Sequence, residues 1–139
     1  QWIDVWNEWH DRSPDVVRDI AVGARDAGYG VIIAAAGLAA HLAGVLAAHT
    51  TLPVVAVPIA TGTLGGVDAL LSSAQMPPGV PLATVGVGGA RNAGLLAAAI
   101  LGVSDSRVAD ALDEYRVTLK KRVADADARV REKLGDTEG

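Results

Sequence analysis

The chain has 139 residues, half of them apolar, and a net charge of −4. This length is typical of one domain, and the acidic balance argues against a nucleic-acid-binding surface, which needs a basic stripe. The absence of cysteine excludes disulfides and thiolate metal sites. The longest apolar stretch, 31–48, is interrupted by Gly37, His41 and Gly44 and is a poor membrane span. With no visible signal peptide, we expect a cytoplasmic protein that binds neither membrane nor nucleic acid.

Strand and helix patterns alternate along the chain, which predicts βαβ units and a parallel sheet. The charge-free, β-branched start of 31–36 is typical of a strand buried on both faces. The first helix has Ser13 as its N-cap hydroxyl and Pro14 at its first position. The predicted strands are 2–6, 31–36, 53–58 and 82–87, and the predicted helices between and after them are 14–27, 38–48, 67–74 and 90–101.

A last helix is predicted from about 105 to 134, capped by Ser104. Its apolar residues recur at steps of three and four and form one face, while the other face is charged. We expect this face to pack on a partner subunit. The alternative is that the helix folds back on the edge of its own sheet. A core built mainly from Ala and Gly buries little area per residue, which also favours oligomerisation.

Ligands of parallel α/β sheets bind at the carboxyl ends of the strands, so the loops after the strands are the candidates for chemistry. His41 follows a strand and a small-residue turn, and Gly88 lies in a glycine-rich turn that could hold an anion. Before the first helix, Arg12 could bind a phosphate or carboxylate, and His10 and Asp11 could transfer protons. The alternatives are a structural His41 and a polar loop with a surface salt bridge. No metal-ligand spacing stands out.

Several motifs that occur in a fixed order indicate a protein family more specifically than any single motif does. The segment 35–44 reads Ala-Ala-Gly-Leu-Ala-Ala-His-Leu-Ala-Gly, and it is followed by matching segments at 50–58, 64–81 and 92–98. Together they resemble the PurE family, the N5-carboxyaminoimidazole ribonucleotide mutases and aminoimidazole ribonucleotide carboxylases of purine synthesis, from about residue 11 to residue 116. The resemblance implies a flavodoxin-like three-layer α/β/α fold, with 1–139 as one domain. It also implies an octamer in which the helix 104–134 reaches a neighbouring subunit.

The implied reaction moves a carboxyl group on a nucleotide-like substrate through CO2, with bicarbonate as the alternative source, and it needs no metal or organic cofactor. By the same resemblance, Asp11 stands where the family has its proton-shuttling histidine, and His10 precedes it by one residue. Arg12 matches the phosphate-binding arginine. The remaining residues that the resemblance assigns to the substrate and its carboxylate are Ser13, Ala36, Gly37, Leu38, Ala39, His41, Leu42 and Gly88.

The chain also departs from the family pattern. The family's Gly-Ser-x-Ser-Asp motif does not occur in residues 1–139, and the sequence leaves open whether it precedes Gln1. Leu38 replaces a glycine and adds bulk where the carboxylate would lie, and Arg91 stands where the family has a small residue. Three hypotheses follow. The chain is a PurE-like mutase or carboxylase, a diverged carboxylase or decarboxylase of another heteroaromatic or nucleotide substrate, or a non-catalytic PurE-like subunit.

Overall fold

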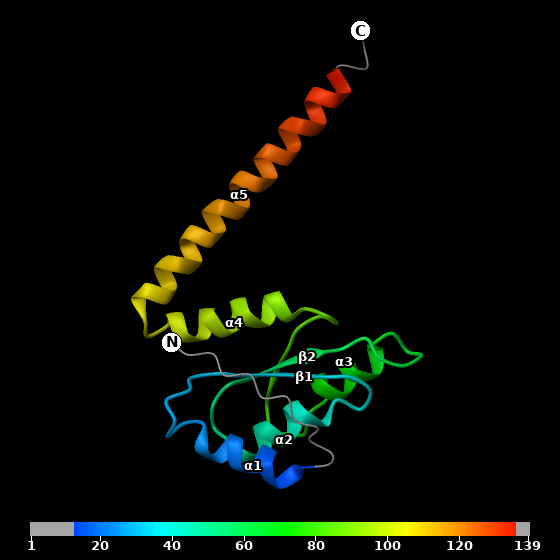
Figure 1. Ribbon diagram of the computed structural model, residues 1–139, viewed down its shortest axis with the longest axis vertical. Coiled ribbons are helices and arrows are strands. Elements are labelled where there is room, and N and C mark those ends of the chain that lie inside the picture. Colours follow the sequence, from blue (N-terminus) through cyan, green and yellow to red (C-terminus); the bar gives the residue numbers. More distant parts are fainter. Residues whose placement is uncertain (1–12, 136–139) are drawn as a thin grey trace.

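A computed structural model describes residues 13–135 of the chain (Figure 1). Helices and strands alternate as the sequence predicts; the predicted strand 2–6 lies outside the described residues. The elements are α1 (Pro14–Gly23), β1 (Ile32–Ala36), α2 (His41–His49), β2 (Val54–Pro58), α3 (Val67–Ala74), β3 (Ala83–Thr84), α4 (Ala90–Gly102) and α5 (Ser106–Gly135).

The three described strands form one parallel sheet in the order β1-β2-β3. Ile32 lies opposite Val54, and Val55 lies opposite Ala83. The third strand is much shorter than the predicted 82–87, because the chain turns away after the Val85 N–H donates to the Ala56 carbonyl at 3.1 Å.

Two helices are also shorter than predicted. The first ends at Gly23 instead of residue 27, because the chain passes into hydrogen-bonded turns that include a bond from the Gly28 N–H to the Arg25 carbonyl. The second begins at His41 instead of residue 38, because residues 37–40 form a separate turn. Ser13 occupies the N-cap of α1 as predicted, but its side chain makes no capping hydrogen bond.

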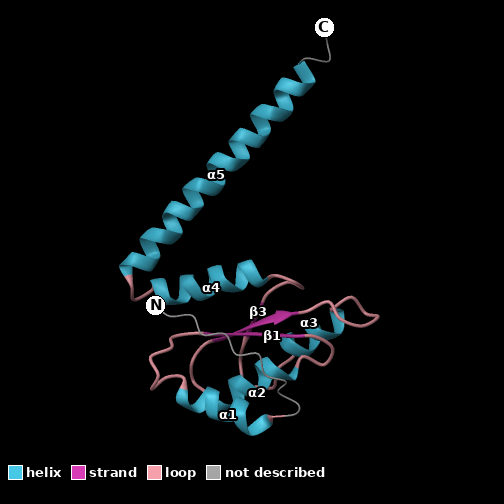
Figure 2. Ribbon diagram, in the orientation of Figure 1, coloured by secondary structure: helices cyan, strands magenta, loops and turns pink. Residues whose placement is uncertain are grey.

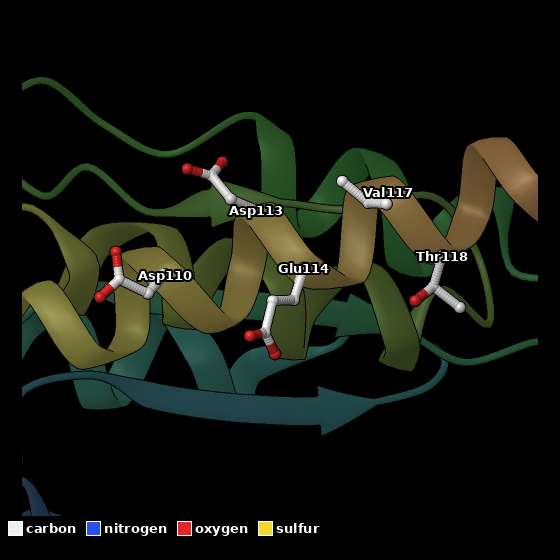
Figure 3. Close-up of a pocket in the computed structure, with 5 residues that line it drawn as sticks. All are labelled: Asp110, Asp113, Glu114, Val117 and Thr118. Atoms are coloured by element: carbon white, nitrogen blue, oxygen red, sulfur yellow. The ribbon is translucent and has the colours of Figure 1, made fainter.

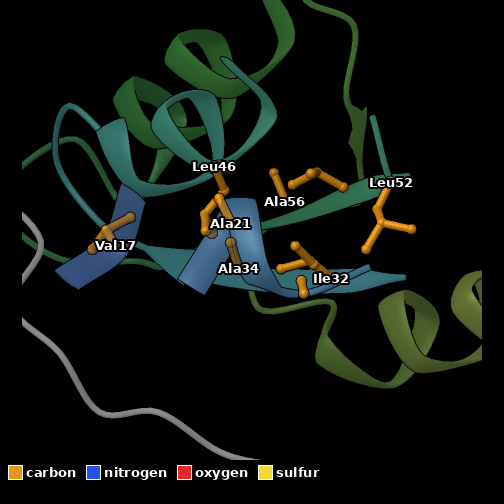
Figure 4. Packing of buried hydrophobic residues seen from close by; sticks show 10 residues of the cluster. Val17, Ala21, Ile32, Ala34, Leu46, Leu52 and Ala56 are labelled. Carbon is orange, nitrogen blue, oxygen red and sulfur yellow. The ribbon is translucent and has the colours of Figure 1, made fainter. Parts of the chain in front are cut away.

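Helices cover both faces of the sheet (Figure 2). Alternate residues of β2 point to opposite faces, as the two-residue period of a strand requires. Val54 and Ala56 join α1 and α2 in one cluster, whereas Val55 and Val57 pack against Ala93 of α4 in another. Figure 4 shows the first cluster, in which the small residues Ala21 of α1 and Ala34 of β1 are both buried. The chain therefore has the three-layer α/β/α architecture predicted for it.

The sequence predicts that the strand 31–36, which is β1 in the structure, is buried on both faces, and this prediction is wrong for one face. Ile32 and Ala34 are buried against α1 and α2, but Ile33 is 47% exposed and Ala35 is also exposed. The physical reason is position: β1 lies at the edge of the described sheet, and the α4 cluster is centred on β2.

The long helix α5 packs its first turns against α4 and then extends away from the domain (Figure 1). None of its residues is buried. Its cap differs from the prediction, because the Asp105 carboxylate, and not the Ser104 hydroxyl, accepts the Arg107 N–H at 3.0 Å. The Ser104 hydroxyl instead donates back to the Leu101 carbonyl. No helix within 13–135 has both the length and the apolar character that crossing a membrane requires.

Candidate functional site

Three loops leave the carboxyl ends of the strands and meet along one edge of the sheet. The first two are joined where the Ile59 N–H donates to the Ala36 carbonyl at 2.9 Å. The third is joined to the end of β2 where the Gly88 N–H donates to the Pro58 carbonyl at 2.8 Å. We call the loops 37–40, 59–66 and 85–89 the carboxyl rim. In a parallel sheet this edge is where ligands bind.

The rim is closely packed because glycines stand at the points of contact. A Cβ added to Gly37 would collide with the side-chain oxygen of Thr61, and one added to Gly66 would lie 2.7 Å from Val87 Cγ1. A side chain larger than hydrogen would push these loops apart. Thr61 was not singled out from the sequence, although the loop 60–66 is visibly rich in Gly and Thr. Gly66 and Val87 lie in the family segment 64–81 and the glycine-rich turn 86–89, but the sequence did not predict that they touch.

The turn that connects β1 to α2 is strained. The Ala40 N–H donates to the Gly37 carbonyl at 2.9 Å and closes a four-residue turn. Inside it Leu38 has φ = 54° and Ala40 has φ = 45°, both in the left-handed region that favours glycine. Such a conformation costs an L-residue roughly 1–2 kcal/mol. Strain of this kind is found most often at functional sites.

Three helices begin at the rim, and none has a side chain that caps its N-terminus. The N-cap residues of α2, α3 and α4 are Ala40, Gly66 and Gly89, and none makes a side-chain capping hydrogen bond. Backbone N–H groups at the start of a helix favour an anion through direct hydrogen bonds and the helix dipole. The rim therefore suits a carboxylate or phosphate. Arg91, at the second position of α4, adds a positive charge to the same edge.

The structure brings together most of the predicted site residues that it describes. His41 is exposed as the first residue of α2, directly after the strained turn. Ser13 is the N-cap residue of α1, which packs alongside α2. Leu42 differs from the others, because it packs in part against the core cluster under α1 and α2. The rim itself contains Gly37, Leu38, Ala39 and, in the third loop, Gly88, and Ala36 ends β1 directly before the first loop.

The candidates for proton transfer and phosphate binding, His10, Asp11 and Arg12, lie outside the described residues. Among the described residues, two buried oxygen atoms lack a hydrogen-bond partner: Asp68 Oδ1 at the start of α3 and Thr84 Oγ1 at the end of β3. Within 13–135 no group of three His, Asp or Glu side chains is placed to hold a metal ion.

A separate hollow lies on α5 (Figure 3). Asp110, Asp113, Glu114, Val117 and Thr118 line it, all from one helix. Three carboxylates make it unfavourable for an anionic ligand, and it opens widely to solvent. The hollow is therefore a shallow surface of the helix, and the carboxyl rim remains the candidate site.

The fold defines a class of protein: a flavodoxin-like α/β domain, here with three helix N-termini at the carboxyl rim that have no side-chain cap. The family model described as AIR carboxylase matches residues 10–122. The chain belongs to this family, as the resemblance predicts.

Relatives and a solved structure agree with this assignment. The chain is 50% identical over 121 residues to N5-carboxyaminoimidazole ribonucleotide mutase of Methanocaldococcus jannaschii, covering 87% of this chain and 74% of that protein. It is 52% identical over 117 residues to the enzyme of that name from Bacillus subtilis, covering 83% of this chain and 72% of that protein. The crystal structure of Treponema denticola PurE superposes with a TM-score of 0.73 at 24% identity, covering 86% of this chain and 75% of that one, and shares the fold.

Proposed function

We propose that this chain is an N5-carboxyaminoimidazole ribonucleotide mutase of purine biosynthesis. The observation that carries the proposal is identity of about half over more than four fifths of the chain to mutases of that name. The carboxyl rim supports it independently, because its uncapped helix N-termini suit the carboxylate and phosphate of such a substrate. The ligand is then a small nucleotide, with CO2 as the transferred group.

The reaction exchanges one bond for another. The bond from N5 to the carboxyl carbon breaks and releases CO2, and N5 takes up a proton. C4 of the imidazole attacks the CO2, and the C4 proton then leaves to a base. The protein positions the ring, excludes water and holds the proton.

The residues at the positions of the family motifs supply these roles. Asp11 or His10 moves the proton, and Arg12 binds the phosphate. His41 and the backbone of the turn 37–40 hold the carboxylate at the start of α2. Gly37, Ala39 and Ala40 are the small residues of this turn, and they leave room for the reacting carboxyl group.

A second candidate function follows from one observation. Leu38 places an exposed apolar side chain in the strained turn, where a glycine would fit without strain. This favours a substrate whose ring differs from aminoimidazole, so the alternative is a carboxylase or decarboxylase of a related heteroaromatic nucleotide.

The assay follows the change in ultraviolet absorbance as the full chain acts on N5-carboxyaminoimidazole ribonucleotide, and separately on aminoimidazole ribonucleotide with bicarbonate. We expect turnover of the first substrate, with kcat reduced at least about 100-fold by the substitution of whichever of Asp11 and His10 transfers the proton. The variants are Asp11→Asn and His10→Asn. Full activity in both would contradict the proton-transfer assignment, and no turnover of either substrate by the wild-type chain would contradict the mutase.

Arg12→Ala tests phosphate binding. We expect KM to rise, because a charge-assisted contact to the phosphate is lost. The matched control is Arg18→Ala, which removes an exposed arginine of α1 that pairs only with its neighbour Asp19 among the contacts described. An equal effect of the two substitutions would contradict the assignment of Arg12.

We also propose that residues 1–139 form one domain that assembles into a homo-oligomer, as an octamer, in the cytoplasm. The support is the apolar face of α5, which continues beyond its contact with α4. Val123 is 70% exposed and Val130 is 56% exposed, and such exposure on a regular face is typical of a protein interface. Val123→Asp should lower the mass measured by light scattering, whereas Val22→Asp, on an exposed part of α1, should not. An unchanged mass for Val123→Asp would contradict this interface.

A further inference from the structure

A long stretch of the chain that includes α3 is almost free of charge. Asp68 is the only Asp, Glu, Lys or Arg between residues 27 and 90, whereas charged residues make up 20% of the whole chain. Much of this stretch is exposed, including most of the loop 59–66 and of the segment 74–81 after α3. Exposed surface without charge is typical of the core of an interface between subunits, where charged residues are depleted.

Three large apolar side chains stand on this surface, and we call them the α3 patch. Leu64 is 63% exposed, Val67 is 54% exposed and Leu71 is 50% exposed. Val67 and Leu71 are four residues apart and lie on one face of α3. Leu64 precedes them in a turn, which is closed where the Val67 N–H donates to the Leu64 carbonyl at 3.1 Å. The three side chains therefore belong to one short segment at the start of the helix.

The α3 patch continues into the carboxyl rim. Leu38, which is 58% exposed, reaches the loop before α3, since a Cβ placed on Gly62 would lie 3.0 Å from Leu38 Cδ2. Val87 of the third rim loop reaches Gly66, the N-cap residue of α3. Exposed apolar side chains from three segments thus gather around the start of α3. A group of this kind marks an interaction site.

The distal part of α5, residues 116–135, is a second exposed surface. Every residue of it is exposed, and Val123, Val130 and Leu134 follow one another at steps of seven and four, along one side of the helix. This part is about 30 Å long, which is the diameter of a small domain. Because α5 packs on α4 and then extends away from the domain, its distal part lies far from the α3 patch of its own chain (Figure 1).

Charge favours one kind of contact for the distal part of α5. Residues 116–135 contain seven basic and three acidic side chains, whereas residues 13–115 contain four basic and eight acidic ones. Two distal parts that lay side by side would repel each other, but each is attracted to the body of another copy. On that body α4 already contacts its own α5, and α1 carries several exposed charges. The α3 patch is the apolar surface that remains.

We propose that the α3 patch binds the distal part of α5 from a second copy of this chain. The inference rests on the proposed assembly through α5, and it names the surface that α5 contacts. It does not depend on the mutase activity. The contact is heterologous, because it joins two different surfaces, the α3 patch of one copy and the α5 of the other.

Aspartate substitutions in the full chain test the α3 patch, with light scattering as the measurement. Leu71→Asp and Leu64→Asp each place a charge in the patch. We expect both variants, like Val123→Asp, to have a lower mass than the wild type. The concentration at which half of the assembly dissociates should rise at least about tenfold, because the contact would bury an unpaired charge. Val22→Asp, on an exposed part of α1, is the control and should keep the wild-type mass.

An equimolar mixture of Leu71→Asp and Val123→Asp chains makes the test specific. The first variant keeps an intact α5, and the second keeps an intact α3 patch, so the mixture contains one complete pair of surfaces. We expect the mixture to have a higher mass than either variant alone. A mixture with the same mass as the separate variants would overturn the inference, because the two surfaces then do not meet.

The single variants also separate this inference from the proposed assembly. If Val123→Asp dissociates while Leu71→Asp and Leu64→Asp both keep the wild-type mass, α5 contacts another surface, so the inference is overturned and the assembly through α5 stands. If Val123→Asp keeps the wild-type mass, the assembly through α5 and the inference are both overturned. Circular dichroism of each variant shows that the chain is folded, and the two patch variants check each other.

Discussion

Gly37→Ala tests whether the rim loops touch as the structure shows. The added Cβ would meet three atoms of one branched side chain: the Thr61 oxygen, with which it collides, Thr61 Cβ at 3.0 Å and Thr61 Cγ2 at 3.1 Å. Rotation of the threonine can move the oxygen and Cγ2. It cannot move Cβ, which is fixed to the backbone, so the loop itself must shift.

The expected cost is that of adding a methyl group to a closely packed contact, about 1–3 kcal/mol of unfolding free energy. The lower end applies, about 1 kcal/mol, because Thr61 is exposed and its loop can move. Backbone strain adds nothing, since Gly37 is not among the glycines with positive φ. The measurement is the urea midpoint of unfolding at fixed protein concentration, together with kcat/KM.

Two further variants make the test specific. Thr61→Gly removes all three atoms, so the double variant should recover much of the stability lost by Gly37→Ala alone. Gly94→Ala is the control of opposite sign. A Cβ at Gly94, inside α4, would meet nothing within 4 Å, and alanine in a helix is more stable than glycine by about 0.5–1 kcal/mol. If Gly37→Ala were as stable as the wild type, or if Thr61→Gly restored nothing, the described contact between the loops would be refuted.

Two other predictions test the sheet and the last helix. Val55→Ala should lower the free energy of unfolding by about 2–3 kcal/mol, because Val55 is fully buried. Ile33→Ala should lower it by about 1 kcal/mol or less, because Ile33 is half exposed. Equal losses in urea unfolding would contradict the exposure of β1. In the wild-type chain the stability of the first turn of α5 should fall in acid, and Asp105→Asn should remove this pH dependence. Hydrogen exchange of the Arg107 amide measures it. Hydrogen bonds from the Arg107 side chain lower the pKa of Asp105 below its ordinary 3.8. The stabilisation is therefore complete above pH 3.8 and is lost as the pH falls through the lowered pKa. Loss of protection in acid that is the same in both proteins would contradict this account.

Local patterns predicted most of the fold. The helix at 67–74 is found at its predicted bounds, and the predicted helix 90–101 ends one residue later, because apolar periodicity and glycine stops act over a few residues. Errors arose where residues of helical propensity lie in a turn. Leu38, Ala39 and Ala40 look helical in sequence, but the hydrogen bond between Gly37 and Ala40 and the two left-handed φ angles delay α2 to His41.

The sequence predicted where the candidate site lies, but it did not predict which residues touch one another there. Small residues after each strand predicted the loops, and parallel topology brought them to one edge. The partners of these loops were not predictable: Thr61 against Gly37 and Val87 against Gly66 join positions more than twenty residues apart. The roles of His10, Asp11 and Arg12 remain predictions from the family motif.

The sequence by itself determined the family and the parallel α/β fold, because ordered motifs and repeating strand and helix patterns are properties of neighbouring residues. Only the tertiary structure decided that Ile33 is half exposed at a sheet edge, that Leu38 crosses to the next loop, and that α5 extends away from its domain. The physical reason is that burial and loop contact depend on what packs beside a residue in space, and segments distant in the chain supply those neighbours.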